Sequence, residues 1–115
     1  MAQFVPATSH RVAALIAPGL EEVEALAVVD LLYRAGVRTD MIAVGPQVQV
    51  VSSHGITLTC DHVLDQVDLA DYDLLFLPGG IPGTPNLDAC EPLMAEVEAR
   101  VRAGRPVAAI CAAPS

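Results

Sequence analysis

The residue with the clearest capacity for chemistry is Cys111, a cysteine that ends a short apolar run. Residues 105–111, RPVAAIC, are typical of a buried strand. A cysteine at a sharp turn from such a strand into a helix lies on a nucleophile elbow, which exposes the thiol and directs backbone N–H groups toward it. A helix N-terminus also stabilises the thiolate. The alternative is a small core residue, and position alone gives the two interpretations equal weight.

Two other segments carry unusual residues directly after predicted strands. Residues 78–83, PGGIPG, combine glycines and prolines in a way that indicates an ordered loop with positive φ angles, and residues 18–24, PGLEEVE, are acidic. Sites in open α/β sheets form beyond the carboxyl ends of the strands, so we expect both segments and Cys111 to converge. A double-glycine loop alone fits a phosphate cradle, an oxyanion hole or a plain turn. Its pairing with Cys111 favours the oxyanion hole.

Three glutamates, Glu21, Glu22 and Glu24, open the helix that is predicted after the first strand. Glu21 lies one turn before Glu24 on about the same face, whereas Glu22 points about 100° away. Carboxylates in a first helical turn complement the helix dipole, and this explains Glu22 without any functional role. From the residues alone, the same explanation is also favoured for Glu24.

The elements that must position these residues alternate between strands and helices. Residues 47–51 and 55–60 alternate in polarity and predict a hairpin or a bent strand outside the parallel core, followed by an acidic, turn-rich segment. Strand–helix–strand units define an α/β class with right-handed connections. The remaining predictions are strands at 11–17, 37–44, 73–77 and 105–111, a helix at 20–35 ended by Gly36, and a helix from Asn86 or Asp88 to Ala103, ended by Gly104.

Composition limits the classes of protein to which the chain can belong. Its 115 residues make one domain, and 53% hydrophobic residues against 17% charged residues exclude disorder. The net charge of −8 argues against nucleic acid as a partner, and no apolar run is long enough for a membrane span. Residues 1–10 carry no secretory signal and are predicted to form a loose arm. Three separated cysteines without a CxxC pair indicate a reducing cytoplasm, no metal, and structural roles for Cys60 and Cys90.

The last predicted strand poses a problem for residues 11–115 as a whole domain. A strand this apolar needs helices on both faces of its sheet, and only two substantial helices are predicted. We therefore expect residues 11–115 to be the N-terminal part of one α/β domain whose remainder is absent from this chain. The hypothesis is that Ser115 is not the end of the gene product.

Three motifs together resemble the PfpI superfamily, a branch of the class I glutamine-amidotransferase-like fold. They are APGLEEVEA (residues 17–25), LPGGIPG (residues 77–83) and VAAICAAPS (residues 107–115). The sequence is most similar to the parkinsonism-associated deglycase branch, often called DJ-one, and especially to its bacterial YajL type. The resemblance covers residues 11–115. It implies a flavodoxin-like, doubly wound parallel sheet with a nucleophile elbow, no cofactor, and a homodimer.

The resemblance also implies a role for each site residue. Cys111 matches the reactive, oxidisable cysteine, and Glu24 matches the buried glutamate that hydrogen-bonds its sulfur. Gly80 and Ala112 match the two positions whose N–H groups form the oxyanion pocket. Burial beside a thiolate pushes a glutamate toward its protonated form, so the acid can donate a proton while the sulfur stays anionic. Substrate-binding positions by the same resemblance are Gly79, Glu21, Arg34 and His54.

The sequence differs from the family pattern at a basic position near the site and in lacking the site histidine. His54 stands where close relatives carry an arginine that reaches the site from the dimer partner, and this puts anion recognition in doubt. Arg34 matches a basic position near the pocket, although the helix dipole alone explains an arginine in a last turn. The family's site histidine is expected beyond Ser115, and His10, His54 and His62 do not match it. No general base is therefore predicted within this chain.

Three functions remain open from the sequence. The first is a cysteine-dependent, cofactor-independent enzyme of the glyoxalase or protein deglycase type, acting on small reactive carbonyls or glycated protein in a stress response. The second is a redox-sensing chaperone in which Cys111 is oxidised to sulfinate. The third is a cysteine peptidase or amidase, which needs a histidine and a supporting acid.

Overall fold

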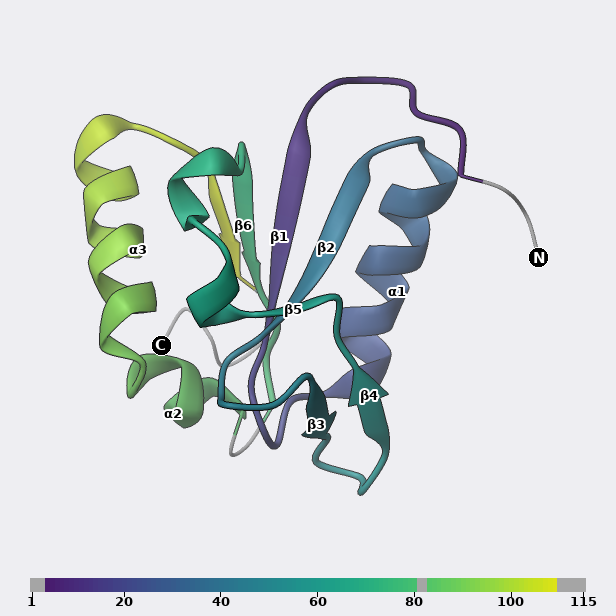
Figure 1. Ribbon diagram of the computed structural model, residues 1–115, viewed down its shortest axis with the longest axis vertical. Coiled ribbons are helices and arrows are strands. Elements are labelled where there is room, and N and C mark those ends of the chain that lie inside the picture. The colour runs from purple at the N-terminus through teal and green to yellow at the C-terminus, as the bar shows by residue number, and fades with distance from the viewer. Residues whose placement is uncertain (1–3, 81–82, 110–115) are drawn as a thin grey trace.

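Residues 4–80 and 83–109, the part of the chain that the computed structural model describes, contain a five-stranded parallel sheet in the order β5-β2-β1-β6-β7 (Figure 1). Its strands are β1 (Arg11–Ile16), β2 (Arg38–Ala43), β5 (His62–Val63), β6 (Leu74–Leu77) and β7 (Val107–Ala109). The predicted α/β class and flavodoxin-like sheet are confirmed. Both neighbours of β1 follow it in the chain, and they lie on opposite sides of it, since β2 pairs on one side and β6 on the other. The strand order therefore reverses at β1, and the loops after β1 and β6 meet at one edge.

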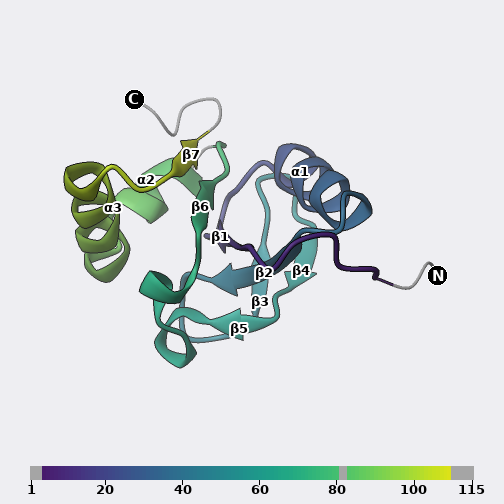
Figure 2. The same ribbon diagram turned by 90° about the horizontal axis from the view of Figure 1, so that it is seen from above.

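Helices cover the two faces of the sheet, with α1 (Glu22–Arg34) on one face and α2 (Gly83–Asp88) and α3 (Glu91–Ala103) on the other (Figure 2). Alternate residues of β1 serve the two layers, as expected for a strand buried on both sides. Val12, Ala14 and Ile16 pack in the cluster beneath α1. Ala13 and Leu15 pack with Leu93 of α3. Within the described residues, no helix combines the length and the apolar character needed to cross a membrane.

Two helix ends fall where glycine was expected to place them. Gly36 follows α1 with φ 77°, and Gly104 caps α3 with φ 71°. The arm also passes over the end of α1, because Ala7 N–H donates to the carbonyl oxygen of Gly36 over 2.9 Å. Residues 4–10 form no helix or strand, and the ring of Phe4 lies 5.2 Å from that of Tyr33.

The helix predicted from Asn86 or Asp88 to Ala103 is confirmed over Glu91–Ala103, but its predicted start is wrong, because a separate helix, α2, precedes α3. Cys90 is the N-cap of α3, and Pro92 lies in its first turn. Proline has no N–H to donate to the carbonyl four residues earlier, so a helix cannot continue through this point without losing a hydrogen bond. The proline that interrupts the predicted helix instead begins a new one.

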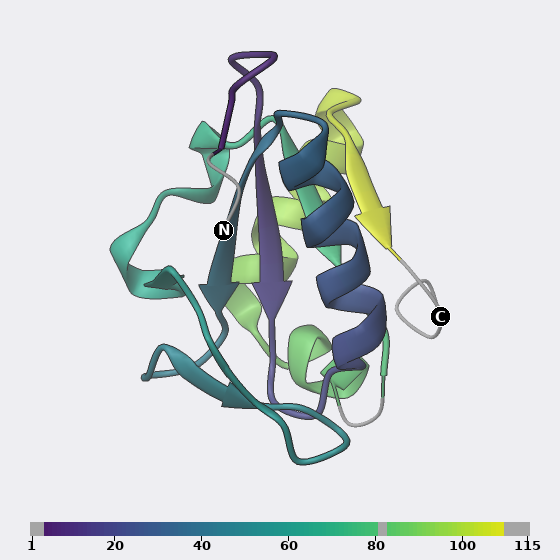
Figure 3. The same cartoon turned by 90° about the vertical axis from the view of Figure 1, so that its right-hand side faces the viewer.

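The predicted hairpin outside the parallel core is confirmed as β3 (Gln49–Val51) paired antiparallel with β4 (Thr57–Thr59). The acidic, turn-rich segment after it begins with the two-residue strand β5, which was not predicted. Two short 3₁₀ helices follow, η1 (Leu64–Gln66) and η2 (Leu69–Asp71). Figure 3 shows the hairpin beneath the start of α1, at the carboxyl end of β1.

A buried arginine joins α3 to the segment before β6. Arg100 is 1% exposed, and its guanidinium donates to the backbone carbonyl oxygens of Leu69, Tyr72 and Asp73. An ion pair with Glu96, one turn earlier on α3, supplies the opposite charge at 2.9 Å. Buried charge is tolerated only with such partners. Arg100 therefore fixes the chain at the amino end of β6, opposite the edge where the loops after β1 and β6 meet.

Candidate functional site

The loops after β1 and β6 contact each other directly at the carboxyl edge of the sheet. Glu21 N–H donates to the carbonyl oxygen of Gly79 over 2.9 Å. The side-chain amide of Asn86 donates to the carbonyl oxygen of Pro18 over 2.6 Å. The predicted convergence of the acidic segment with the double-glycine loop is therefore confirmed.

The third member of that convergence is Cys111, which lies outside the described residues, as does Ala112. The register of β7 is nevertheless informative, since Ala109 pairs with Leu77 of β6. The strand thus brings the chain to the edge from which the double-glycine loop departs. The roles of Cys111 and Ala112 stay predictions.

Gly80 occupies a position that only glycine fits. Its φ is 111°, and a Cβ built on it would collide with the backbone nitrogen of Glu21 and lie 2.9 Å from the carbonyl carbon of Leu20. The predicted positive φ is confirmed at this residue. Gly79 beside it is buried. The glycine pair thus lets the β6 loop lie against the backbone that starts α1.

The three glutamates at the start of α1 have three different environments. Glu21 is the N-cap, and its side-chain oxygen accepts the N–H of Val23 over 3.1 Å. Glu24 lies one turn further along and is half-buried. Glu22 is only 4% exposed. The interpretation of Glu22 as a solvated, dipole-complementing residue is therefore incomplete, because a carboxylate so enclosed needs specific partners.

The partner of Glu22 is His54, from the turn between β3 and β4. The imidazole Nδ1 lies 2.7 Å from one carboxylate oxygen of Glu22 and 3.0 Å from the other. This hydrogen bond lowers the pKa of Glu22, and the same carboxylate raises the pKa of His54, with a further contribution from Glu21. The Nδ1 atom is 3.9 Å from Glu21 Oε1. Glu22 and His54 are 32 positions apart, and no sequence motif connects them.

Glu21, Glu22 and His54 also have the ligand types that hold a metal ion, with candidate ligand atoms within 4.8 Å of one another in the described chain. The 2.7 Å separation between His54 and Glu22 is that of a charge-assisted hydrogen bond. The positive end of the α1 dipole also lies here and disfavours a cation. The three residues are therefore best described as a hydrogen-bonded ion pair with Glu21 nearby.

Backbone hydrogen bonds join the same turn to the loop after β1. Gly19 N–H donates to the carbonyl oxygen of Val51 over 2.9 Å, and Ser53 N–H donates to that of Leu20 over 2.8 Å. The hairpin, the start of α1 and the double-glycine loop consequently form one connected unit. We call these three segments the interlocked loops: residues 51–56, 18–22 and 78–80.

Other residues singled out from the sequence lie away from the interlocked loops. Arg34 is in the last turn of α1 and pairs with Asp30 at 3.0 Å. It lies about 18 Å along the helix from Glu22, at 1.5 Å per residue. Cys60 is buried, and burial raises the pKa of its thiol to about 11, which suits a structural role. Cys90 caps α3 and does not lie in the interlocked loops.

The fold and the interlocked loops define a flavodoxin-like α/β protein with its candidate site at the carboxyl edge of the sheet. A family model for the DJ-1/PfpI family matches residues 10–115. The chain belongs to the DJ-1/PfpI family, and the resemblance inferred from the three motifs is confirmed.

Individual relatives agree in sequence and in structure. The chain is 37% identical over 100 residues to Protein DJ-1 homolog B of Arabidopsis thaliana, covering 87% of this chain and 23% of that protein. The structure of oxidized DJ-1 from Toxoplasma gondii aligns with a TM-score of 0.87 at 31% identity, covering 92% of this chain and 58% of that one. Drosophila melanogaster DJ-1beta aligns with a TM-score of 0.87 at 30% identity, covering 93% and 57%. The chain thus spans about a quarter of the Arabidopsis protein and just over half of the two aligned structures.

Proposed function

We propose that this chain belongs to a stress-response enzyme that uses Cys111 to attack small reactive carbonyl compounds, in a cofactor-independent reaction of the glyoxalase or deglycase type. The observation that carries the proposal is the contact between the Gly79–Gly80 loop and the start of α1, at the edge to which β7 leads. Membership of the DJ-1/PfpI family supports the same assignment. A cytoplasmic location remains a prediction.

The proposed chemistry uses the chain's own groups and water. The thiolate of Cys111 adds to the aldehyde carbon, and the N–H groups of Gly80 and Ala112 stabilise the oxygen that becomes negative. Glu24 gives that oxygen a proton, which yields a hemithioacetal. With methylglyoxal, proton transfer between the two former carbonyl carbons then forms a lactoyl thioester. Water hydrolyses the thioester to lactate and restores the thiol, so no external oxidant or reductant is consumed.

Gly80 and Glu24 support this proposal from two neighbouring elements. Gly80 is held against the α1 backbone in a conformation that other residues do not readily adopt. Glu24 is half-buried on the first turns of α1. Oxyanion stabilisation requires donors that are held in place, and the close approach of Gly80 to the start of α1 supplies this for the first proposed donor.

The test is turnover of methylglyoxal by the full-length protein, followed as lactate formed. Cys111→Ser should abolish turnover, and Glu24→Gln should reduce it strongly because the proton donor is lost. Cys60→Ser and Cys90→Ser serve as matched controls and should retain activity. Full lactate production by Cys111→Ser would eliminate the proposal. Peroxide-induced sulfinate on Cys111 without any turnover would instead favour the redox-sensing chaperone.

We also propose that the protein forms a homodimer through the outward face of α1 and the adjoining hairpin. Val23 and Leu31 on α1 are 68% and 65% exposed, and Val51 and Ile56 of the hairpin are 50% and 48% exposed. Large apolar side chains exposed on adjoining elements are typical of an interface. The helix is acidic in its first turn and basic in its last. An antiparallel pair of α1 helices would therefore bring opposite charges together across a two-fold axis.

The dimer proposal is tested by sedimentation of the full-length protein. Leu31→Asp should shift the protein toward monomer, because a charge would be buried in the contact. Val101→Asp is the matched control, since Val101 is 69% exposed on α3 and lies outside the proposed interface. A wild-type monomer at micromolar concentration, or equal dissociation by both variants, would contradict the proposal. Arg34 and His54 remain predicted contributors to substrate binding, as do Gly79 and Glu21.

A further inference from the structure

His54 is the side-chain link between the hairpin and the rest of the interlocked loops. It projects from the turn after β3, and its imidazole meets Glu22 at the first position of α1. Two backbone hydrogen bonds, from Gly19 to Val51 and from Ser53 to Leu20, run between the same two segments. Within the described residues, the hairpin is therefore attached to the start of α1 by the close His54–Glu22 ion pair and by these main-chain hydrogen bonds.

The attachment reaches the double-glycine loop at Glu21. Glu21 stands next to Glu22, and its N–H donates to the carbonyl oxygen of Gly79. Gly80 rests against the same Glu21 nitrogen and has no room for a side chain there. A displacement at the start of α1 would consequently be transmitted to the loop that carries the proposed oxyanion donor.

Because Glu22 is buried, breaking the His54–Glu22 ion pair would be costly. The side chain of Glu22 is 5% exposed, whereas that of His54 is 61% exposed. A buried carboxylate that loses its charged partner must find water or another donor, and the surrounding segments move to allow it. Ser52, from the same turn, makes the smallest contribution to the lowered pKa of Glu22. His54 is thus the principal partner of Glu22 in the described chain.

We propose that His54 is a positioning residue: by binding Glu22 it clamps the β3–β4 turn onto the first turn of α1, and so holds the Glu21–Gly79 contact that orients the double-glycine loop. The catalytic consequence rests on the proposed carbonyl chemistry. The clamp itself does not, because it is a property of contacts that exist without substrate.

The clamp depends on pH through the groups that face it. The charged groups near His54 in the described residues are Glu22 and Glu21, both from the start of α1, while Ser53 Oγ lies 3.4 Å from Nδ1. The facing part of the β6 loop, Gly79 and Gly80, has no titratable side chain. The raised pKa of His54 means that its contribution is complete below the ordinary value of 6.5 and is lost as pH rises through the folded value. The lowered pKa of Glu22 removes the contribution only as pH falls below 4.5 through its own folded value.

The direct test is hydrogen–deuterium exchange of the full-length protein at the amides of Glu21 and Ser53, corrected for intrinsic exchange at each pH. In the wild type, protection at both amides should fall several-fold between pH 6 and pH 9. His54→Gln should show the low protection at every pH, because a neutral amide cannot supply the charge. His54→Arg should keep high protection to pH 9, since its guanidinium stays charged. Oligomeric state is recorded for each sample, so that dissociation is not mistaken for local opening.

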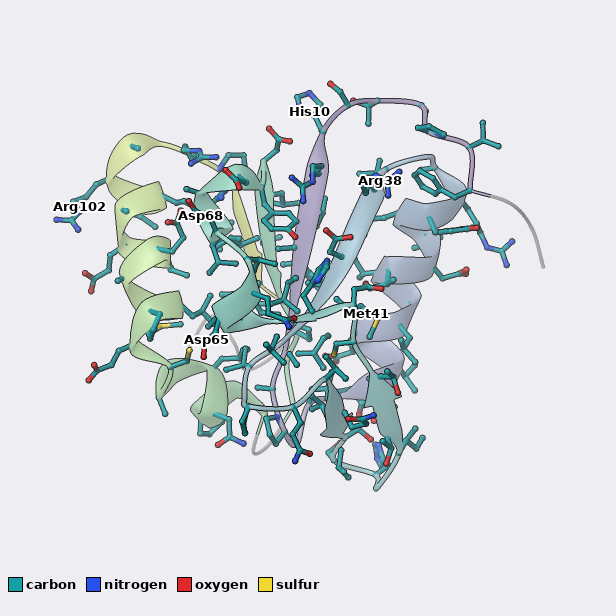
Figure 4. All side chains as sticks on the ribbon, in the orientation of Figure 1. His10, Arg38, Met41, Asp65, Asp68 and Arg102 are labelled. Atoms are coloured by element: carbon teal, nitrogen blue, oxygen red, sulfur yellow. The ribbon has the colours of Figure 1, made fainter. Side chains whose placement is uncertain are left out.

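His10→Gln is the matched control. His10 is also exposed, and it faces Asp73 at 3.5 Å. It precedes β1 at the amino edge of the sheet, the end opposite the hairpin (Figure 4). This variant should reproduce the wild-type exchange profile. Wild-type protection in His54→Gln at pH 6, or an equal loss in His10→Gln, would overturn the clamp.

Kinetics separate the clamp from the proposed function. If both hold, His54→Gln should lower kcat for methylglyoxal several-fold with little change in KM, and His54→Arg should restore kcat and flatten its alkaline decline. If the exchange results appear but neither Cys111→Ser nor His54→Gln changes carbonyl turnover, the clamp stands and the carbonyl function fails. If turnover requires Cys111 but exchange is unaffected by His54→Gln, the function stands and the positioning role is refuted.

Discussion

Gly80→Ala tests whether the double-glycine loop is locked against α1. The substitution introduces a methyl group where the Glu21 nitrogen already lies, at a backbone φ of 111°. A non-glycine residue in a sparsely populated φ region costs about 1 to 3 kcal/mol. Overpacking against fixed neighbours adds about 1 to 3 kcal/mol. If the loop keeps its place, the free energy of unfolding should therefore fall by about 2 to 6 kcal/mol.

Two other glycines of the same chain separate these contributions. Gly55 has φ 78° but nothing within 4 Å of the place a Cβ would take. Gly45 has the same open space, and its φ is not positive. Gly55→Ala should cost about 1 to 2 kcal/mol from backbone strain alone. Gly45→Ala should change the free energy of unfolding by less than about 0.5 kcal/mol. The excess cost of Gly80→Ala over Gly55→Ala then measures the collision with the start of α1.

The assay is urea unfolding of the full-length variants, combined with the rate at which iodoacetamide alkylates Cys111. If the loop shifts to relieve the collision, the protein loses less stability, but the loop moves away from Glu21 and the alkylation rate of Cys111 changes. A large loss of stability, or a smaller loss with a changed alkylation rate, therefore supports the close approach of Gly80 to Glu21. The reasoning is refuted if Gly80→Ala and Gly55→Ala unfold at the same urea concentration and Cys111 reacts in both at the wild-type rate.

Two further predictions concern residues away from the interlocked loops. Arg100→Met should lower the free energy of unfolding by about 2 to 4 kcal/mol, because the carbonyl oxygens that it binds each lose a charged donor and Glu96 loses its partner. Arg102→Met on the same helix should cost less than about 0.5 kcal/mol. Equal urea midpoints for the two variants would contradict the structural role of Arg100. Cys60, with its pKa raised to about 11 by burial, should resist iodoacetamide at pH 8 in the native protein and react after unfolding. Native labelling of Cys60 at the rate of a free thiol, measured by mass spectrometry, would show that it is not enclosed.

The sheet could be predicted from the sequence because its signal is local. Residues 11–17 and 73–77 form apolar runs that end at Pro18 and Pro78, and each predicts a strand buried on both faces. The change to helical spacing before Gly36 marks α1 in the same way. These features depend on residues that are neighbours in the chain, so a single sequence contains them.

The Glu22–His54 pair could not be predicted, because its partners are 32 positions apart and come from different elements. First-turn glutamates usually face solvent, and a turn histidine usually does as well. Only the placement of the hairpin beneath α1 makes them neighbours. The burial of Arg100 has the same origin, since its acceptors are carbonyl oxygens that carry no side-chain signal. The break between α2 and α3 is different, because Pro92 was a visible signal for it.

The amino and carboxyl edges of the sheet are held by different kinds of polar contact. At the amino edge, Arg11 and Tyr72 both donate to Asp40, with the Tyr72 hydroxyl at 2.8 Å. Burial and that carboxylate raise the pKa of Tyr72 to about 12, so the phenol stays a donor across the physiological range. At the carboxyl edge, the contacts include main-chain hydrogen bonds and a histidine that titrates, so the histidine contact can change with pH.

The difference between the two edges predicts that a substitution at one edge leaves the other unaffected. Asp40→Asn weakens the acceptor of Tyr72 at the amino edge, and it should lower the urea midpoint while leaving the alkylation rate of Cys111 and its pH profile unchanged. His54→Gln should do the reverse, altering the pH profile with a smaller effect on the midpoint, because the hairpin lies outside the parallel core. Effects of distant, unconnected sites add, so the double variant should show the sum of the two changes. A shift in the Cys111 pH profile caused by Asp40→Asn would mean that the sheet transmits strain between its edges, and the carboxyl edge could not then be treated as a separate unit.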